Sequence, residues 1–533
     1  MAAAEALSNA LIVEAILKRV PDPADIVHFR LVSTLWNEVI LSFHSPPRVT
    51  VHLNRAVPWR DAVAQGPFIT PRKLASFPPK LLKSIALTAH PDDDAILPQA
   101  VNLLAQIGPH IHHLSVLGGA SVGKFVHNIF AQCEFEKLKN LRVILDEKKV
   151  HTYKRRDRPY VTWPEVGNPE ISEKPKLLKI QYIVESKFLL GSDVSEEQQT
   201  FLRFLLAVTP NLESLRVKDD YLSGIPADFG NLSEFRFNWN IGKNKSPDMV
   251  TLQNLNVFLE TVKVSLERLQ LTVGFTGFRR LYDFSQFSDQ FRFPRDGIRN
   301  LKWFENGVMR IFKCGVRDLE KMGKLKHLDL CEIPNEVYQR ANVYVGNILR
   351  RDNACWGGIT NLKLCGIEDL ELLERIGPMF PSLRRLNINV RLWIFKQGEL
   401  NVFLRMIFER LAPIKALTHI SVGAPFPTRF SRFIDFLEYL ATSFPDVTEV
   451  RIEHCMCDGG TGDRTYQRFY DPAEVDAIQM DRFRNLVPTL LGCRELTEFT
   501  GMDIAHLQTG LVFRRGSPFQ SELPWKQNKG GKI

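Results

Sequence analysis

Apolar residues recur along most of the chain in one short phased pattern: an apolar residue, two mostly polar residues, a second apolar residue, one intervening residue and a third apolar residue. Successive copies begin mostly about 24 to 35 residues apart. The copies are Leu82-Ile85-Leu87, Ile111-Leu114-Val116, Leu138-Leu141-Val143, Leu177-Ile180-Tyr182, Leu212-Leu215-Val217, Leu232-Phe235-Phe237, Leu266-Leu269-Leu271, Ile298-Leu301-Trp303, Leu325-Leu328-Leu330, Ile359-Leu362-Leu364, Leu383-Leu386-Ile388, Leu417-Ile420-Val422 and Val447-Val450-Ile452, with a weak copy at Leu496-Phe499.

Each copy predicts a short strand, because its last two apolar residues lie two positions apart and therefore point to the same side. Several stretches between the copies have apolar residues three and four apart, which predicts helices. These stretches are Gln199–Val208, Leu255–Val264, Leu370–Phe380, Leu400–Leu411 and Phe433–Phe444. Three of them are followed by a proline that stops the helix, at Pro210, Pro381 and Pro445.

A strand, a loop and a helix in about 30 residues make one turn of a repeat fold, and no such turn can bury its apolar side without neighbours. The pattern resembles leucine-rich repeats. Cys331 and Cys365 occupy the position after the third apolar residue, where that family has Asn or Cys, whereas most copies lack either residue. The resemblance implies an α/β solenoid. A βαβ domain of another kind stays open, because strands that alternate with helices also predict a parallel sheet.

The first 40 residues have a different period, typical of short amphipathic helices. Ser8 can cap a first helix, and Asp22-Pro23 is a helix start signal. The predicted apolar side of the first helix is formed by Leu11, Ile12, Ala15 and Ile16, and that of the last helix by Val32, Leu35, Trp36, Val39 and Ile40.

This segment resembles an F-box: a leucine-rich helix, a Pro-Asp turn, and a helix with Leu31-Val32-Ser33 and a Trp four residues after the Val. It departs from that family at Ser8 and Ala10, where a proline and an acidic residue are usual. The resemblance implies docking to the Skp adaptor of a cullin-RING ubiquitin ligase. The residues that match adaptor-contact positions of the family are Leu7, Ile16, Pro23, Ile26, Val32, Ser33 and Trp36. An ordinary helical cap on the next domain is the alternative.

The two patterns together predict four regions: an F-box over 1–45, a proline-rich linker over 46–80 that packs on the solenoid, degenerate leucine-rich repeats over 81–510, and a basic disordered tail over 511–533. The whole chain resembles F-box/leucine-rich-repeat receptors. That resemblance implies substrate recognition for a Skp–cullin–F-box ligase, with the protein substrate bound by the repeats and no catalysis by the chain itself. The alternative is a scaffold outside the ubiquitin system, in which the F-box-like start only caps the repeats.

Composition and charge fit this interpretation. The 533 residues are 44% hydrophobic and 24% charged, which is typical of globular proteins. A net charge of +9 over this length does not form the concentrated basic stripe expected of a nucleic-acid binder. Neither a membrane-spanning run nor a signal peptide is apparent, and the eight cysteines lack a disulfide spacing. We therefore expect a reducing compartment, cytoplasmic or nuclear.

Chemical motifs are few, and they predict neither a cofactor nor a metal. Gly118–Lys124 has P-loop spacing, but Phe125 replaces the Ser or Thr that holds magnesium, which disfavours a nucleotide enzyme. His454-Cys455-Met456-Cys457 lacks the second ligand pair of a structural zinc site.

Two groups of basic residues are candidate functional features. The basic stretch over 148–158 is predicted to be a solvated loop or a localisation signal. Basic residues near strand ends are weak candidates for binding an acidic or phosphorylated substrate, namely Arg384, Arg385 and Arg391.

Overall fold

A computed structural model gives the fold as α/β, with parallel strands and helices in alternation, in two compact units that divide at Arg280 and Leu281. The described residues are 7, 9–17, 19–20, 26, 28–42, 49–52, 68–69, 77, 81–88, 96–118, 122–146, 174, 176–185, 192–219, 229–241, 249–275, 290–309, 311–331, 343–351, 354–367, 369–390, 400–424, 435, 438–439, 443–444, 447, 449–454 and 511–514.

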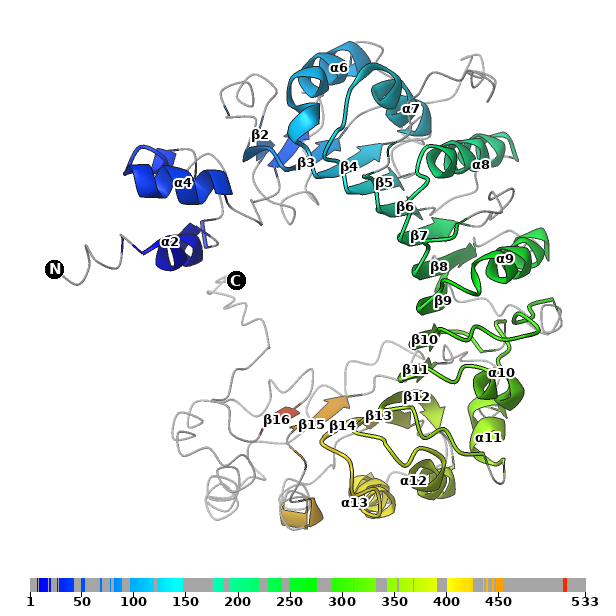
Figure 1. The fold of residues 1–533 in the computed structure, drawn as a ribbon. Coiled ribbons are helices and arrows are strands. Elements are labelled where there is room, and N and C mark those ends of the chain that lie inside the picture. Colours follow the sequence, from blue (N-terminus) through cyan, green and yellow to red (C-terminus); the bar gives the residue numbers. More distant parts are fainter. Residues whose placement is uncertain are drawn as a thin grey trace, which may run out of the picture. The chain divides into compact units, whose positions relative to one another are not determined.

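The first unit begins with two short helices and continues as a parallel sheet with helices along one side (Figure 1). Its helices are α2 (Ala10–Leu17), α4 (Thr34–Ser42), α6 (Ile96–Ile107), the 3-10 helix η3 (Gly108–His110), α7 (Val122–Gln132), α8 (Ser192–Ala207) and α9 (Met249–Val262). Its strands are β1 (Val49–His52), β2 (Phe68–Ile69), β3 (Ser84–Thr88), β4 (His113–Gly118), β5 (Asn140–Asp146), β6 (Lys179–Glu185), β7 (Ser214–Asp219), β8 (Glu234–Ile241) and β9 (Arg268–Phe275).

Strands β3 to β9 lie side by side in sequence order, and each pairs in parallel with the next in a constant register. The register aligns the predicted apolar pairs with one another, so that Ile85 lies beside Leu114, and Leu114 beside Leu141. All of these residues are buried. The predicted strand pattern is therefore confirmed in this unit, and its two apolar rows form the wall of the core.

The chain enters successive strands through the same backbone hydrogen bonds. The carbonyl of Lys83 accepts from the amides of both His112 and His113, and the carbonyl of His112 accepts from Lys139 and Asn140. The carbonyls of Lys139, Leu178, Glu213 and Ser233 accept in the same way from the next strand–helix segment. The residue at the first apolar position of each copy lies just before this point and is buried, which explains why three apolar positions recur instead of two.

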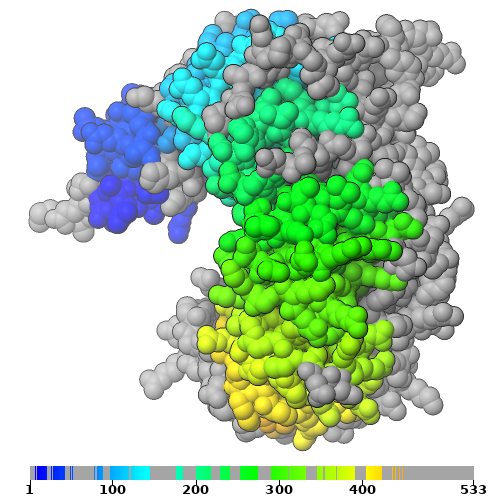
Figure 2. Space-filling view, turned by 45° about the vertical axis from the view of Figure 1, so that its right-hand side comes forward, coloured from blue at the N-terminus to red at the C-terminus, as the bar shows by residue number. Residues whose placement is uncertain are grey.

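The helices of the first unit cover one side of the sheet with an apolar stripe. In α8 this stripe is Phe201, Leu202, Leu205 and Leu206, at the spacing of a helix side. Phe201 meets Tyr182 of β6 edge to face, with ring centroids 5.8 Å apart. Successive coloured segments of this unit lie next to one another from cyan to green (Figure 2). Each segment therefore lies directly beside the next along the sheet.

Two strands lie in the stretch that the sequence predicts to be a linker. β1 pairs in parallel with β3 and with β2, and Val49 and Val51 are buried. The sheet therefore begins before residue 81, and the linker prediction over 46–80 does not hold for these two segments. The apolar alternation of Val49 and Val51 is the signal for this strand, and the surrounding prolines obscured it.

The second unit repeats the arrangement of parallel strands and short helices. Its strands are β10 (Trp303–Asn306), β11 (His327–Leu330), β12 (Asn361–Ile367), β13 (Arg385–Val390), β14 (His419–Ala424), β15 (Glu449–His454) and β16 (Leu511–Arg514). Its helices are α10 (Val316–Glu320), α11 (Val343–Leu349), the 3-10 helix η6 (Leu370–Arg375), α12 (Ile376–Met379) and α13 (Leu400–Leu411). Strands β10 to β15 pair in parallel, with the buried Leu328, Leu362 and Leu386 in one row.

One predicted copy in the second unit is wrong in register. Phe304 and Asn306, instead of Leu301 and Trp303, align with Leu328 and Leu330, so the copy at 298–303 is displaced by three residues. The third inward position is then the fully buried Asn306, whose amide nitrogen donates to Phe312 O over 2.5 Å. The apolar pattern misses this displacement because a buried, hydrogen-bonded amide replaces an apolar residue.

The other differences lie near the end of the chain. β16 pairs antiparallel with β15, although residues 511–514 belong to the predicted disordered tail. α13 has the predicted bounds. Of the described residues in the predicted helix Phe433–Phe444, Asp435, Glu438, Tyr439 and Ser443 are helical, whereas Phe444 is not. The weak copy at 496–499 lies outside the described residues.

Candidate functional site

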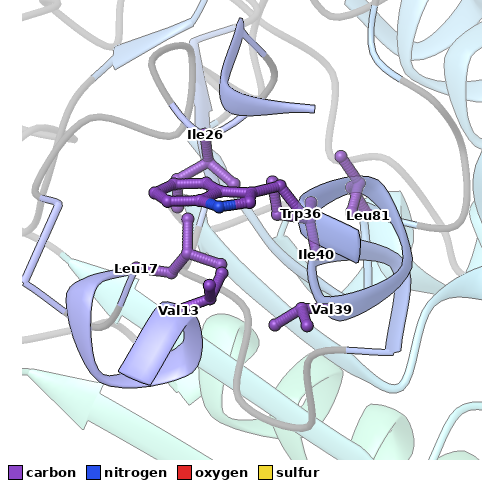
Figure 3. Close-up of a cluster of buried hydrophobic side chains, with 7 residues drawn as sticks. All are labelled: Val13, Leu17, Ile26, Trp36, Val39, Ile40 and Leu81. Atoms are coloured by element: carbon purple, nitrogen blue, oxygen red, sulfur yellow. The ribbon is translucent and has the colours of Figure 1, made fainter. Parts of the chain in front are cut away.

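The N-terminal helices enclose a small apolar core of their own. Its buried residues are Val13 and Leu17 from α2, Trp36, Val39 and Ile40 from α4, and also Ile26 and Leu81. Figure 3 shows the Trp36 ring between Ile26 and Leu17, with Leu81 at the edge of the cluster. The helical element is thus held together through Trp36 and contacts, through Leu81, the segment that precedes β3.

Two polar side chains set where these helices begin. Asn9 caps α2, because its side-chain oxygen accepts from Leu11 N over 2.9 Å. Ser33 caps α4 in the same manner, with Trp36 N as the donor at 3.2 Å. The sequence predicts Ser8 as the first cap; Ser8 lies outside the described residues, and the neighbouring Asn9 has this role.

The apolar surface of the first helix differs from the predicted one. Val13 and Leu17 are buried, whereas Leu11, Ile12 and Ala15 of the predicted apolar side are exposed. Ile16 is half-buried against the core. The helix is apolar around most of its circumference, so its sequence did not reveal which side faces inward. Consequently α2 buries one apolar side and presents a second.

An exposed apolar surface results at this end of the chain. Seven large hydrophobic side chains in the described residues are strongly exposed, and five of them lie within the first 32 residues: Leu7 (45%), Leu11 (76%), Ile12 (40%), Leu31 (85%) and Val32 (59%). We call these five the N-terminal apolar surface. Leu11 and Ile12 lie in α2, and Leu7 lies before this helix. Leu31 and Val32 lie in the turn before α4. Trp36 Nε1 donates to Leu7 O over 3.2 Å and links the two segments.

The seven residues that match adaptor-contact positions separate into four groups. Leu7, Val32 and Ser33 are exposed, and Ile16 is half-buried. Ile26 and Trp36 are core residues, at 4% and 6% exposure, so they hold the helices together rather than offer a surface. Pro23 lies outside the described residues. The exposed Leu11, Ile12 and Leu31 are absent from the predicted set. That set was chosen by similarity to sequence positions of the F-box family, and such similarity does not show which side chains are exposed.

The basic candidates of the second unit are only partly described. Arg385 is exposed on β13, at a position that aligns with Asn361 and His419 of the neighbouring strands. Arg384 is exposed just before β13, where its backbone carbonyl accepts from Thr418 N and His419 N. Arg391 lies outside the described residues. These arginines therefore flank a strand entry, and the described residues around them do not form a closed site.

The P-loop-like stretch connects a strand to a helix, as a P-loop does, but it lacks the magnesium ligand. β4 ends at Gly118 and α7 begins at Val122, with Lys124 half-buried in the first turn of the helix. Phe125, at the position of the ligand hydroxyl, is 6% exposed and lies in the core. The residue thus stabilises the fold at the place where a P-loop binds the metal.

We therefore expect the purified protein to lack nucleotide binding through Lys124. Isothermal titration with ATP and magnesium should give no saturable heat in the wild type or in Lys124→Ala, and the two should melt at the same temperature. Binding in the wild type that Lys124→Ala removes would restore the nucleotide interpretation.

Other chemistry is similarly limited within the part of the chain that the structure describes. These residues contain no group of three or more His, Cys, Asp or Glu side chains placed to hold a metal ion. His454 ends β15, and Cys455 and Cys457 lie outside the described residues. None of the described helices has the length and apolar character to cross a membrane.

Comparison with known proteins provides no family assignment. No protein-family model matches the chain, and no curated protein is similar to it at a significant level.

Proposed function

We propose that this protein is the substrate-recognition subunit of a Skp–cullin–F-box ubiquitin ligase, with an N-terminal F-box and a leucine-rich-repeat solenoid. The observation that carries the proposal is the N-terminal apolar surface. A helical element that buries one apolar side in its own core and presents another has a surface suited to a partner, since large exposed apolar patches mark interaction sites. Its position at the residues that resemble an F-box supports a Skp-type adaptor as that partner.

The division of labour follows from the arrangement of the elements. The helical element contacts the repeats through Leu81, so that its exposed side chains are available for the adaptor. The repeats present polar strand positions opposite their apolar rows, and such extended surfaces suit protein ligands. In this role the chain performs no bond chemistry: it raises the effective concentration of a substrate near the ubiquitin-loading enzyme.

A second candidate function is a scaffold outside the ubiquitin system, in which the helices only cap the repeats. The packing of Leu81 into the helical core favours this interpretation, because a cap needs such a contact. The exposure of Leu11, Leu31 and Val32 counts against it, since a cap requires a polar outer side. Adaptor binding distinguishes the two functions.

The exposed side chains should carry adaptor binding. In the double variant Leu11→Asp/Val32→Asp we expect affinity for a purified Skp adaptor to fall by about a hundredfold or more, because two apolar contacts are lost and two carboxylates are buried. The melting temperature should stay unchanged, since both side chains are exposed in the free protein. Biolayer interferometry with immobilised adaptor measures the loss.

Val257→Asp is the matched control, because Val257 of α9 is 65% exposed and lies outside the N-terminal element. It should bind the adaptor as the wild type does. A wild type without measurable adaptor affinity, or a double variant with full affinity, would rule out the ligase proposal.

A further inference from the structure

The sheet of the first unit has a groove on the side opposite its apolar rows. The groove has a volume of about 380 Å³ and is lined by residues of β3 to β8, which lie next to one another in Figure 1. We call it the strand groove. Its titratable lining residues are His113, Arg142, Lys179, Arg216, Glu234 and Arg236.

The strand register spreads the positive charges of the groove over adjacent strands. Arg142 aligns with Gln181, Gln181 with Arg216, and Arg216 with Arg236, in one row across β5 to β8. Because neighbouring strands lie about 4.8 Å apart, this row extends over about 14 Å. That length exceeds the reach of one carboxylate or one phosphate, so a matching ligand has several negative groups.

The carboxylate of the described lining is already engaged. Glu234 accepts from Ser214 Oγ over 2.8 Å and from Arg236 Nε over 2.8 Å, and it forms a salt bridge with Arg268 at 3.3 Å. Burial favours a higher pKa for Glu234, but the hydrogen bonds from Ser214 and Arg236 and the charges of both arginines outweigh it and lower the pKa. Glu234 therefore stays ionised and is held by Arg236, at the β8 end of the row, and by Arg268 of the neighbouring β9.

The other end of the row has donors without acceptors. Arg142 Nε is buried and has no hydrogen-bond partner among the described residues. Lys179 and Arg216 form no salt bridge with a described residue. The side chain of Arg216 is exposed as a whole, yet partial burial of its guanidinium and the like charges of Arg236 and Arg142 lower its pKa, against the opposing attraction of Glu234. Like charges held together at unpaired donors favour an anionic ligand.

We propose that the strand groove binds an extended acidic segment of a protein, with its carboxylates or phosphates on Arg142, Lys179 and Arg216. In an extended chain, alternate side chains lie about 7 Å apart on one side. Three acidic residues at alternate positions therefore span about 14 Å, which covers the distance of about 10 Å between Arg142 on β5 and Arg216 on β7, with Lys179 on β6 between them. Nucleic acid fits less well, because the described lining contains no Phe, Tyr or Trp on which bases stack. As a substrate site of the ligase, this inference rests on the proposed function.

The test measures binding of defined peptides to the full chain by fluorescence anisotropy. The probe is a labelled peptide of about eight residues with Glu at alternate positions, compared with versions that carry Gln or phosphoserine at those positions. We expect the Glu and phosphoserine peptides to bind, the Gln peptide not to bind, and salt to weaken binding. In Arg142→Gln/Arg216→Gln the dissociation constant should rise by about tenfold or more, since two charge-assisted contacts are lost.

Arg203→Gln is the control, because Arg203 is exposed on α8 and loses the same charge away from the groove. It should bind the peptides as the wild type does, and all three proteins should melt at the same temperature. Equal affinity of the double variant and the wild type, or equal binding of the Gln peptide, would overturn the proposal. Displacement of the peptide by inorganic phosphate at the concentration of the peptide itself would also overturn it, because the groove would then hold single anions.

The same proteins separate this inference from the proposed function when they are tested for adaptor binding. Adaptor binding without peptide binding would leave the ligase role standing and remove the groove. Peptide binding that depends on Arg142 and Arg216, in a chain without adaptor affinity, would support the groove and remove the ligase role.

Discussion

Leu328→Asp should unfold the strands of the second unit around β11. Leu328 is fully buried, and its neighbours in the row are the buried Phe304 and Leu362. The substitution removes a leucine from a packed core and places a carboxylate there without a partner, so we expect the free energy of unfolding to fall by about 4 kcal/mol or more. Because each strand–helix segment is buried by its neighbours, the loss should spread to β10 and β12. Urea unfolding and amide hydrogen exchange measure both effects.

Lys326→Glu is the control two positions earlier. Its side chain is exposed, and only its backbone takes part in the strand entry, as donor to Lys302 O and as acceptor from Thr360 N. The free energy of unfolding should therefore change by no more than about 0.5 kcal/mol. Equal losses at both positions would contradict the observed register.

The strand rows were predictable because their signal is local and repeated. A leucine at the second position of a copy, such as Leu215 or Leu328, is buried and stands beside the same position of the next copy, which is apolar too. Prediction failed where chemistry replaced the apolar side chain, as at Asn306, whose hydrogen bonds to Phe312 O and Val308 N satisfy a buried amide. A search for apolar periodicity cannot detect a buried polar residue whose hydrogen bonds are formed within the protein.

The candidate sites were harder to predict because exposure depends on which neighbour covers a residue. Leu11 and Val13 are similar in sequence terms, yet Leu11 is 76% exposed and Val13 is buried by the Trp36 cluster. Arg142 and Arg216 stand 74 positions apart in the chain and share a row only through the strand register. The signal for this row is the residue between the second and third apolar positions of each copy, because the constant register places these residues side by side.

Trp36→Ala should dissolve the N-terminal helical element and leave the repeats folded. Trp36 is 6% exposed, lies at the centre of the helical core, contacts Phe29 with ring centroids 5.6 Å apart and donates to Leu7 O. Its removal should cost about 3 to 5 kcal/mol of packing. Helices of 8 and 9 residues, the lengths of α2 and α4, do not persist alone in water. Hydrogen exchange should therefore accelerate in α2 and α4 while β4 to β8 keep their protection.

Two control variants, Trp36→Phe and Leu31→Ala, test whether the effect of Trp36→Ala comes from the loss of the buried ring. Trp36→Phe keeps an aromatic ring in the core and should keep most of the protection in both helices, because only the outer part of the ring and the bond to Leu7 are lost. Leu31→Ala removes a side chain that is 85% exposed, so the helices should stay folded while the proposed adaptor affinity falls. A Trp36→Ala protein with wild-type exchange in α2 and α4 would show that Trp36 does not hold the element together. In that case the N-terminal apolar surface would need another support.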